Sequence, residues 1–495
     1  MMKNIRSHAV VVTALTVVTL ALTGVGEAAD IGANDDTGKF AADGGSVFFD
    51  RMSGLGLRQT VMTVRFLPGQ PETIQGKEFL DNAVPAAASR GLKVVFAIYP
   101  YPPSSLTRTA SEVRAFADYA ALVARTYPQV QQFVVGNEPN QPAFWRPQFS
   151  SRGVVLSAPS FGRYLAAAYD ALKDVDSGIT VVGVGLSPRG NDNAIARNNV
   201  STSPVRFLSS LGAWYRHSGR TKPLMDGFAF HPYPRAATDP LLRGYDWPNA
   251  GFVNLTRVKQ AFWDAFHDTP QPTTEDGLKL YLNEVGWQVR TTGLPGYTGS
   301  ENVPVTTERK QAAVYADLVR RSACDPDVAE VNFFGFYDDV SRDQGFQAAL
   351  NRLDGTPRPS SAAVSAAIAK TSRHPCRQLL SWAPATTVTG ARMGAPKLQR
   401  SGAIRALVGA KEGATALVCL IRTGSSTRRQ VSSVSSLLRS AVAPCWRGHL
   451  TPRFGLTARL DVPVALRGLV LVAARISAQA NPARGSSFVA EASGP

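Results

Sequence analysis

The sequence predicts a (β/α)8 TIM barrel followed by a small all-β, sandwich-like domain. Up to about residue 372, short apolar runs alternate with helix-like segments, which implies parallel strands joined by right-handed crossovers. Eight such pairs in roughly 340 residues match the scale of this barrel with enlarged loops. After about residue 378 the helical pattern stops, and short strand-like segments separated by Gly, Ser and Thr turns follow, as in small β domains.

The barrel elements are expected in alternation along the chain. Residues 92–98 (LKVVFAI) form a nearly continuous apolar run, typical of a strand buried on both faces. The sequence Thr109-Ala110-Ser111-Glu112 is a capping-box pattern that predicts a helix start. An open doubly wound sheet is the competing architecture, but the sequence has no Gly-rich phosphate loop after the first strand. The expected strands are 31–33, 60–66, 92–98, 132–136, 179–184, 227–231, 279–283 and 330–337, and the expected helices lie near 46–55, 78–90, 109–126, 160–175, 205–217, 255–267, 308–323 and 360–370.

The N-terminus predicts secretion. Lys3 and Arg6 precede an uncharged, mostly apolar stretch at 9–22, and mostly small residues follow at 24–29, the pattern of a signal peptide. The apolar part is about 14 residues long, short of the roughly 20 needed to span a bilayer. We therefore expect an extracellular protein without stable membrane insertion, with an uncleaved anchor as the alternative. The predicted division is a signal peptide at 1–29, the barrel at 30–375, the β domain at 379–476 with strands at 404–408, 414–421, 456–460 and 469–472, and a flexible tail at 477–495.

The four cysteines predict disulfides rather than a metal site. None is in a CxxC pair and no His cluster accompanies them in the sequence, which disfavours zinc. Export permits disulfides, and the sequential pairs are Cys324–Cys376 and Cys419–Cys445. This is one of three possible pairings of four cysteines.

The chain is basic, with a formal net charge of +16 and a pI near 9.9. Such a charge can favour acidic glycans, cell-wall polymers or nucleic acid. The excess is mostly scattered arginine, and the sequence has no basic stripe interleaved with aromatic residues, which nucleic-acid modules use. We therefore expect no nucleic-acid partner.

Two glutamates follow buried strands. Glu138, in Asn137-Glu138-Pro139-Asn140, comes after the apolar run 133–136, and Glu284 ends the run 280–283. In a barrel of this kind the active site lies at the C-terminal ends of the strands. Two carboxylates placed there suit cleavage of a glycosidic bond, since one donates a proton to the leaving oxygen and the other attacks the sugar or activates water.

The barrel resembles the clan A glycoside hydrolases, a group of retaining (β/α)8 enzymes. The Asn-Glu-Pro-Asn form and the accessory β domain look most like the family 39, β-xylosidase-like branch, with the cellulase-like family 5 second. The resemblance implies a secreted retaining glycoside hydrolase that acts on a poly- or oligosaccharide as a monomer, with no cofactor or metal. It rests on segments similar to the acid/base, nucleophile and sixth-strand motifs, which are Gly136-Asn137-Glu138-Pro139-Asn140, Asn283-Glu284-Val285-Gly286-Trp287 and Phe230-His231-Pro232-Tyr233.

The resemblance also implies roles for individual residues. Glu138 would be the general acid and base, and Glu284 the nucleophile. Asn137 would hydrogen-bond the sugar 2-hydroxyl, Tyr233 would donate to Glu284, and His231 would hold a carboxylate or the substrate.

Further residues near the predicted strand ends are candidates for substrate binding. Arg65 could support the Glu284 carboxylate as a fixed cation, or pair with a core carboxylate. The aromatic side chains Tyr99, Trp287 and Tyr337 could stack on sugar faces, although Trp287 could equally be a packing residue. The eighth strand lacks the tryptophan that this clan often has, which leaves the sugar preference open.

Two other functions remain open at this stage. A degenerate barrel could bind a glycan without cleaving it, and a transglycosidase could use the same residues to pass the sugar to another hydroxyl.

Asp35 and Asp36, after the first strand, are expected to be loop or cap residues.

Overall fold

A computed structural model of the chain describes residues 29–373, 382, 384, 391–394, 396–410, 414–422, 444–450, 456–461, 470–478 and 485–491. The predicted signal peptide therefore lies outside the described residues, apart from Ala29. Among the residues that are described, no helix is long and apolar enough to cross a membrane.

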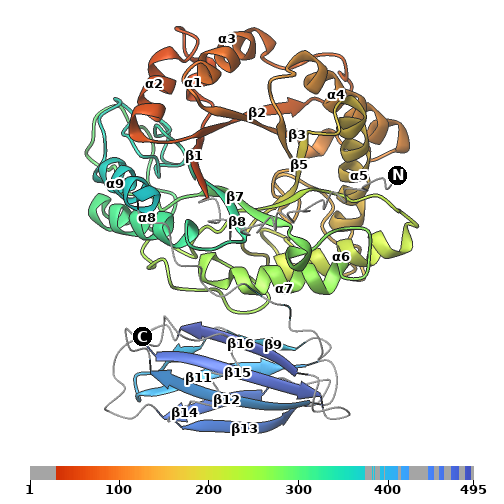
Figure 1. The fold of residues 1–495 in the computed structure, drawn as a ribbon, viewed down its shortest axis with the longest axis vertical. Coiled ribbons are helices and arrows are strands. Elements are labelled where there is room, and N and C mark those ends of the chain that lie inside the picture. The colour runs from red at the N-terminus through yellow and green to blue at the C-terminus, as the bar shows by residue number, and fades with distance from the viewer. Residues whose placement is uncertain are drawn as a thin grey trace, which may run out of the picture.

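The N-terminal part is a closed barrel of eight parallel strands in the order β1 to β8, so the predicted (β/α)8 fold is confirmed (Figure 1). The barrel closes because β1 pairs in parallel with both β2 and β8. The strands are β1 (Asp30–Asn34), β2 (Gln59–Phe66), β3 (Lys93–Pro100), β4 (Gln132–Val135), β5 (Thr180–Leu186), β6 (Gly227–Phe230), β7 (Lys279–Val285) and β8 (Val328–Phe334). The α-helices of this part are α1 (Thr37–Phe40), α2 (Ser46–Leu55), α3 (Lys77–Ala88), α4 (Ala110–Thr126), α5 (Ser157–Val175), α6 (Pro204–His217), α7 (Leu255–Phe266), α8 (Glu308–Ser322) and α9 (Pro359–Arg373).

The start of α4 shows how local sequence sets an element boundary. The Thr109 side chain accepts a hydrogen bond from the backbone N–H of Glu112 at 3.3 Å. The Glu112 carboxylate in turn accepts from the backbone N–H groups of Thr107 and Arg108. The Thr109 side chain therefore satisfies one backbone donor that the helix start leaves unpaired, whereas Glu112 binds the two residues before the cap and not the N–H of Thr109.

The barrel interior contains an apolar layer and a polar layer. Small β-branched and alanine side chains, among them Val61, Val134 and Val182, form the apolar layer. At the N-terminal ends of the strands, Gln132 donates to Glu330 at 2.9 Å and Asn332 donates to the other oxygen of Glu330 at 3.1 Å. Burial raises the pKa of Glu330, against hydrogen bonds that lower it.

The last barrel strand ends earlier than the sequence indicates. Strand β8 stops at Phe334 rather than at Tyr337, because Gly335 has a φ of +88° and turns the chain. The backbone N–H groups of Phe336 and Tyr337 then donate to Oδ2 of Asp35 at 2.7 and 2.9 Å. Asp35 is thus a loop residue, as expected, and Phe334 stands at the strand end.

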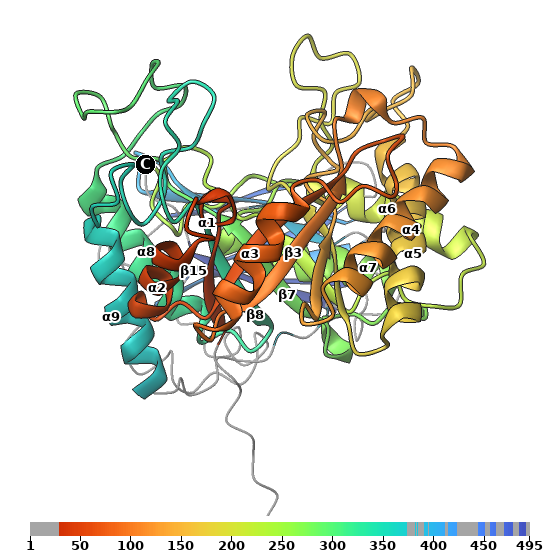
Figure 2. The same ribbon diagram turned by 90° about the horizontal axis from the view of Figure 1, so that it is seen from above.

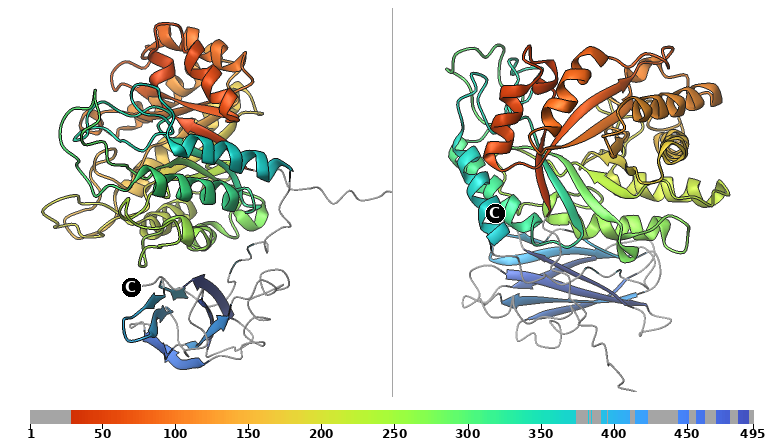
Figure 3. Two further views of the ribbon diagram at one scale, coloured as in Figure 1. Left: turned by 90° about the vertical axis from the view of Figure 1, so that its left-hand side faces the viewer. Right: turned by 45° about the horizontal axis from the view of Figure 1, so that its top comes forward.

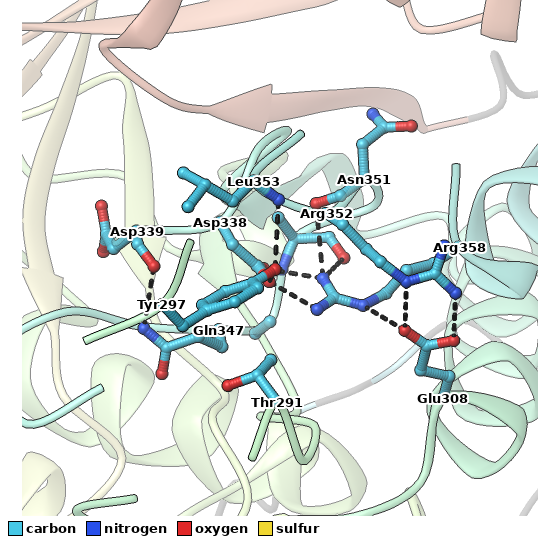
Figure 4. A network of polar contacts seen from close by, with 12 residues as sticks. Thr291, Tyr297, Glu308, Asp338, Asp339, Gln347, Asn351, Arg352, Leu353 and Arg358 are labelled. Atoms are coloured by element: carbon cyan, nitrogen blue, oxygen red, sulfur yellow. Dashed lines mark hydrogen bonds and ion pairs between the residues drawn. The ribbon is translucent and has the colours of Figure 1, made fainter. Parts of the chain in front are cut away.

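Long loops gather at the C-terminal end of the barrel strands (Figure 2). Two of them, at 286–307 and 335–358, are fastened by a network around Arg358 (Figure 4). Arg358 and Asp338 form a fully buried bidentate ion pair, with Nη1 to Oδ1 at 2.7 Å. Tyr297 also donates to Asp338 at 2.7 Å, and Glu308 accepts from Arg358 at 3.1 Å.

The C-terminal part contains two antiparallel sheets that share one apolar core (Figure 3). One has the order β10-β11-β14 with β9 paired to β11, and the other has the order β13-β12-β15-β16. The strands are β9 (Arg392–Met393), β10 (Lys397–Leu398), β11 (Ala403–Gly409), β12 (Ala414–Arg422), β13 (Cys445–Leu450), β14 (Leu456–Asp461), β15 (Val470–Ala478) and β16 (Gly485–Glu491). Part of the predicted flexible tail is therefore a strand, because β16 pairs with β15 along residues 485–491.

The predicted Cys419–Cys445 disulfide is present and joins register partners on β12 and β13. Cys324 is also disulfide-bonded, and its predicted partner Cys376 lies outside the described residues.

Contacts between described residues of the β domain and the barrel include an ion pair and a cation–π contact. Lys397 forms an ion pair with Asp246 at 3.0 Å. The Arg392 guanidinium lies over the Trp247 ring, 4.8 Å from its centroid. Both barrel residues belong to the loop between β6 and α7, at 231–254.

Candidate active site

The ends of β4 and β7 bring Glu138 and Glu284 together. One carboxylate oxygen of each glutamate and a ring nitrogen of His231 all lie within 4.8 Å of one another. Glu138 has a φ of +41°, a left-handed conformation that is uncommon for a side-chain-bearing residue. Its backbone N–H donates to the carbonyl of Gly185 at 2.8 Å. Strain of this kind collects at functional sites.

An irregularity at the end of β5 makes room for His231. The register between β5 and β6 shifts between Val184 and Leu186, and Gly185 has a φ of +64°. A Cβ atom at position 185 would lie 3.1 Å from Nε2 of His231. Glycine is therefore needed here both for the backbone conformation and for the close approach of the imidazole.

His231 lies between the two carboxylates. Its Nδ1 is 3.0 Å from Oε1 of Glu138 and 3.4 Å from Oε2 of Glu284, and its side chain is fully buried. Burial alone would lower the pKa of the imidazole, but the charge of Glu284 and the hydrogen bond and charge of Glu138 outweigh it, so the pKa is raised. A protonated His231 can donate to either glutamate.

Glu284 is held through both of its oxygens. Tyr233 donates its hydroxyl hydrogen to Oε2 at 3.1 Å, and the Asn34 amide donates to Oε1 at 3.4 Å. Burial raises the pKa of Glu284, His231 and Tyr233 lower it, and the nearby Glu138 raises it further. Burial and the two glutamates also raise the pKa of Tyr233 well above its ordinary value, so this hydroxyl stays a donor.

The short distance between the two glutamate oxygens and the hydrogen-bond donors around them suit a pair made of an acid–base residue and a nucleophile. The two carboxyl groups of retaining glycosidases lie about 5–5.5 Å apart, whereas those of inverting enzymes lie about 6.5–9.5 Å apart. A divalent cation could be held by the same three groups, Glu138, His231 and Glu284. Two N–H or O–H donors already occupy the oxygens of Glu284, which favours a hydrogen-bonded carboxylate over a metal ligand.

Three further predicted residues lie near this pair. Asn137 is half-buried and precedes Glu138 in the chain. Tyr99 is buried, and this burial, with a smaller contribution from the charge of Glu284, raises its pKa. Arg65 is exposed, its guanidinium lies 4.9 Å from the Tyr101 ring centroid, and it hydrogen-bonds Tyr99. Arg65 therefore contacts tyrosines rather than pairing with a core carboxylate.

Two predicted sugar-stacking residues are placed elsewhere. Trp287 is only 1% exposed and donates its indole N–H to the carbonyl of Asp239 at 3.0 Å, so it is a packing residue. Tyr337 accepts a hydrogen bond from Arg51 of α2 at 2.8 Å and packs edge-on against Phe48. It faces α2 because β8 ends three residues before it.

Three residues of the site were not predicted from the sequence. Asn34 ends β1 and donates to Glu284. Phe334 ends β8, and Phe346 lies in the loop that follows. The rings of both pack edge-on against Tyr233, with centroid distances of 6.3 and 5.4 Å. The end of each apolar run was the available signal, but the mostly apolar stretch 331–337 hid the true end of β8.

The fold and the site define a TIM-barrel protein with a paired-carboxylate centre. Comparisons with protein-family models and with curated protein sequences found no match. Solved structures similar to the chain are glycoside hydrolases, as the motifs led us to expect. One is a family 39 glycoside hydrolase from the gut symbiont Bacteroides cellulosilyticus, with 16% identity, a TM-score of 0.46, and coverage of 89% of this chain and 82% of that one.

Two further similar structures have comparable scores. A GH5_18 protein from Streptomyces cattleya has 16% identity, a TM-score of 0.46, and coverage of 73% of this chain and 84% of that one. A glucosidase from Croceicoccus marinus has 12% identity, a TM-score of 0.48, and coverage of 89% and 94%. At this level of similarity, neither the substrates nor the catalytic residues of these proteins carry over to the present chain.

Proposed function

We propose that the protein is a secreted retaining glycoside hydrolase that cleaves O-glycosidic bonds in a poly- or oligosaccharide by double displacement. The observation that carries the proposal is the placement of Glu138 and Glu284 at two strand ends, with oxygens within 4.8 Å and His231 between them. Oxygens this close favour the short carboxyl spacing of retaining enzymes, about 5–5.5 Å, over the wider spacing that admits a water molecule in inverting enzymes.

The first half-reaction would use both glutamates at once. Glu138 donates its proton to the leaving oxygen while Glu284 attacks the anomeric carbon, which forms a glycosyl-enzyme ester. In the second half-reaction Glu138 takes a proton from water, which attacks the anomeric carbon and releases Glu284. No cofactor is needed for these steps.

The neighbouring residues would prepare the two carboxylates. Tyr233 and Asn34 fix the orientation of Glu284, so that little reorganisation is needed when it attacks. His231 places a donor next to both glutamates. Asn137 would hydrogen-bond the sugar 2-hydroxyl, and Arg65 and Tyr99 would contact the substrate nearby.

The test is product analysis by mass spectrometry with a broad panel of plant, bacterial and exopolysaccharide glycans. The wild type is compared with two variants, Glu284→Gln and Glu72→Gln. The second is the control, because it makes the same change at an exposed glutamate that is distant from Glu284 in the sequence. Products from the wild type and Glu72→Gln, and none from Glu284→Gln, are expected. Equal cleavage by all three proteins, or glycan depletion without cleavage, would contradict the proposal.

A second experiment separates double displacement from its alternatives. A 2-deoxy-2-fluoro glycoside of the sugar released in the first test should label Glu284, as peptide mass mapping would show. Label on another residue would refute the assigned nucleophile. Products lengthened by one sugar, rather than shortened, would identify a transglycosidase.

Secretion is tested separately. Expression of the full chain in a secreting bacterial host should give extracellular protein whose N-terminus lies close to residue 29 or 30. Retention of the intact N-terminus in the membrane fraction would contradict this part of the proposal.

A further inference from the structure

The positive charge of the chain is concentrated in the C-terminal part. Residues 374–495 contain 16 Lys and Arg but only three Asp and Glu, whereas residues 1–373 contain 37 Lys and Arg and 34 Asp and Glu. A general arginine bias of the whole sequence would affect both parts alike. The cationic character is therefore specific to the β domain.

The strand register places three of these cations in one row. Lys397 of β10 and Arg459 of β14 are both register partners of Arg405 on β11. All three are exposed, whereas the neighbouring residues of β11, Ile404 and Ala406, face the shared core. The row therefore crosses the outer face of the β10-β11-β14 sheet.

Lys397 is already paired with Asp246, but the contact between Arg405 and Arg459 is unfavourable unless an anion covers it. Like charges directly opposite each other on neighbouring strands destabilise a sheet. Among the described residues, the carboxylate that pairs with Arg459 is that of Asp461, at 3.7 Å, and the Arg459 side chain stays 59% exposed. Because stability alone disfavours Arg405 opposite Arg459, the pair indicates a site for an anionic partner.

We infer that this outer face binds a polyanionic glycan, through carboxylate or sulfate groups on successive sugars. Neighbouring strands lie about 4.8 Å apart, close to the length of one sugar unit, so the row can meet consecutive anionic groups. Arginine is suited to the task because its planar fork binds such groups through two hydrogen bonds.

Two features favour a glycan over nucleic acid. The outward positions of the described β10, β11 and β14 residues carry Lys, Arg, Leu, Thr and Asp but no aromatic side chain, and single-stranded nucleic acids are held largely by aromatic stacking. The row also begins at the loop that carries Tyr233, because Lys397 pairs with Asp246 of that loop. This inference rests on the proposed glycosidase function, since tethering the enzyme to a polymer raises the local substrate concentration.

The test measures binding by the full-length Glu284→Gln protein, so that turnover does not remove the ligand. The probes are polygalacturonate and dextran sulfate, each with its uncharged counterpart, methyl-esterified polygalacturonate and dextran. The test variant carries Arg405→Ala and Arg459→Ala in addition to Glu284→Gln. Its matched control carries Arg114→Ala and Arg125→Ala, two exposed arginines of α4.

We expect the parent protein and the control to bind at least one of the two polyanions, and neither uncharged polymer. The Arg405/Arg459 variant should bind about tenfold or more weakly, with an affinity that depends less on salt. A thermal midpoint of the variant that equals or exceeds that of the parent protein excludes loss of folding as the cause, and removal of the like-charge contact favours such a midpoint. The polymer that binds distinguishes a carboxylated from a sulfated partner.

Several outcomes would overturn the inference. These are no binding to either polyanion, unchanged affinity of the Arg405/Arg459 variant, equal binding to the uncharged polymers, or tighter binding to duplex DNA than to the glycans. The proposed hydrolase function is judged separately, by turnover of short neutral glycosides. The wild-type and Arg405/Arg459 proteins should hydrolyse the neutral glycosides equally. Failure of the binding proposal can therefore be told apart from failure of the hydrolase proposal.

Discussion

Tyr233 donates its hydroxyl hydrogen to the same Glu284 oxygen that lies 3.4 Å from His231. One oxygen of the glutamate thus has two donors beside it, and Asn34 donates to the other. Burial raises the pKa of Glu284, and the contacts with His231 and Tyr233 oppose this effect. The balance between them determines the pH range in which this carboxylate is ionised.

Replacing Tyr233 with Phe should shift the acid limb of the pH profile of kcat/KM to higher pH. The lost hydrogen bond lowered the pKa of Glu284, so its removal raises that pKa, and this carboxylate, the proposed nucleophile, becomes protonated at a higher pH. A hydrogen bond to a charged group contributes about 1.5–3 kcal/mol, so kcat/KM should also fall roughly 10- to 100-fold. Tyr215→Phe, which loses only a bond to the backbone of Lys222, is the control. An unmoved or lowered acid limb would contradict the role of Tyr233.

Replacing Glu138 with Ala should make the rate depend strongly on the leaving group. Substrates with good leaving groups need no proton from the enzyme, so their glycosylation rate should change little. Unactivated glycosides should lose about 10²–10⁴-fold. Added azide, which needs no general base, should restore turnover of the activated substrates and give a glycosyl azide of retained configuration, detectable by NMR. A uniform loss across all leaving groups would refute the acid–base assignment.

Replacing Arg358 with Met should destabilise the barrel by about 3–5 kcal/mol, because it leaves the Asp338 carboxylate buried without its cation. The matched control is Arg321→Met, which removes a half-exposed ion pair with Asp317 and should cost no more than about 1 kcal/mol. Urea unfolding followed by tryptophan fluorescence measures both. Equal midpoints for the two variants would show that the buried network does not stabilise the loops at 286–307 and 335–358.

Replacing Glu330 with Gln should change how stability depends on pH. Burial raises the folded-state pKa of Glu330, so the stabilisation it contributes is fully present below the unfolded pKa, about 4.3, and is lost as pH rises through the folded pKa. The variant has no such ionisation. Its thermal midpoint relative to the wild type should therefore increase from pH 4.5 to pH 8, and a constant difference would contradict the raised pKa.

The sequence predicted the barrel well because its strands are fully buried. Runs such as 92–98 are apolar on both faces, and the helices between them carry clear start signals, as at Thr109. The positions of Glu138 and Glu284 followed directly, since a strand end in a parallel barrel places a side chain at the active-site face.

The sequence predicted less well where an apolar run continues past the end of its strand. In the stretch 331–337 the turn at Gly335 ends β8, so Tyr337 packs on α2 and Phe334 takes the place at the strand end. The short strands of the β domain were also incompletely predicted, because β9 and β10 are two residues each and β16 begins in a polar, Ala- and Ser-rich segment.

Asn34 and Trp287 show a second limit of predicting residue roles from the sequence. Nothing in the sequence distinguishes a strand-end asparagine that donates to a carboxylate 250 positions away from one that caps a turn. Likewise, a tryptophan that follows a catalytic motif can face a sugar or the core, and only the packing of Trp287 against Tyr315 and its bond to Asp239 decide this.

The loop at 231–254 has a consequence for engineering. It begins with His231 and Tyr233 and contains Tyr245, which donates to the Tyr233 carbonyl at 3.2 Å. One and two residues later come Asp246 and Trp247, which contact the β domain. Deleting the β domain would therefore strip partners from the segment that orients Glu284, so a truncated protein would not report the behaviour of an undisturbed barrel. For the same reason, a chimaera that grafts this β domain onto another barrel must carry residues 245–247 with it.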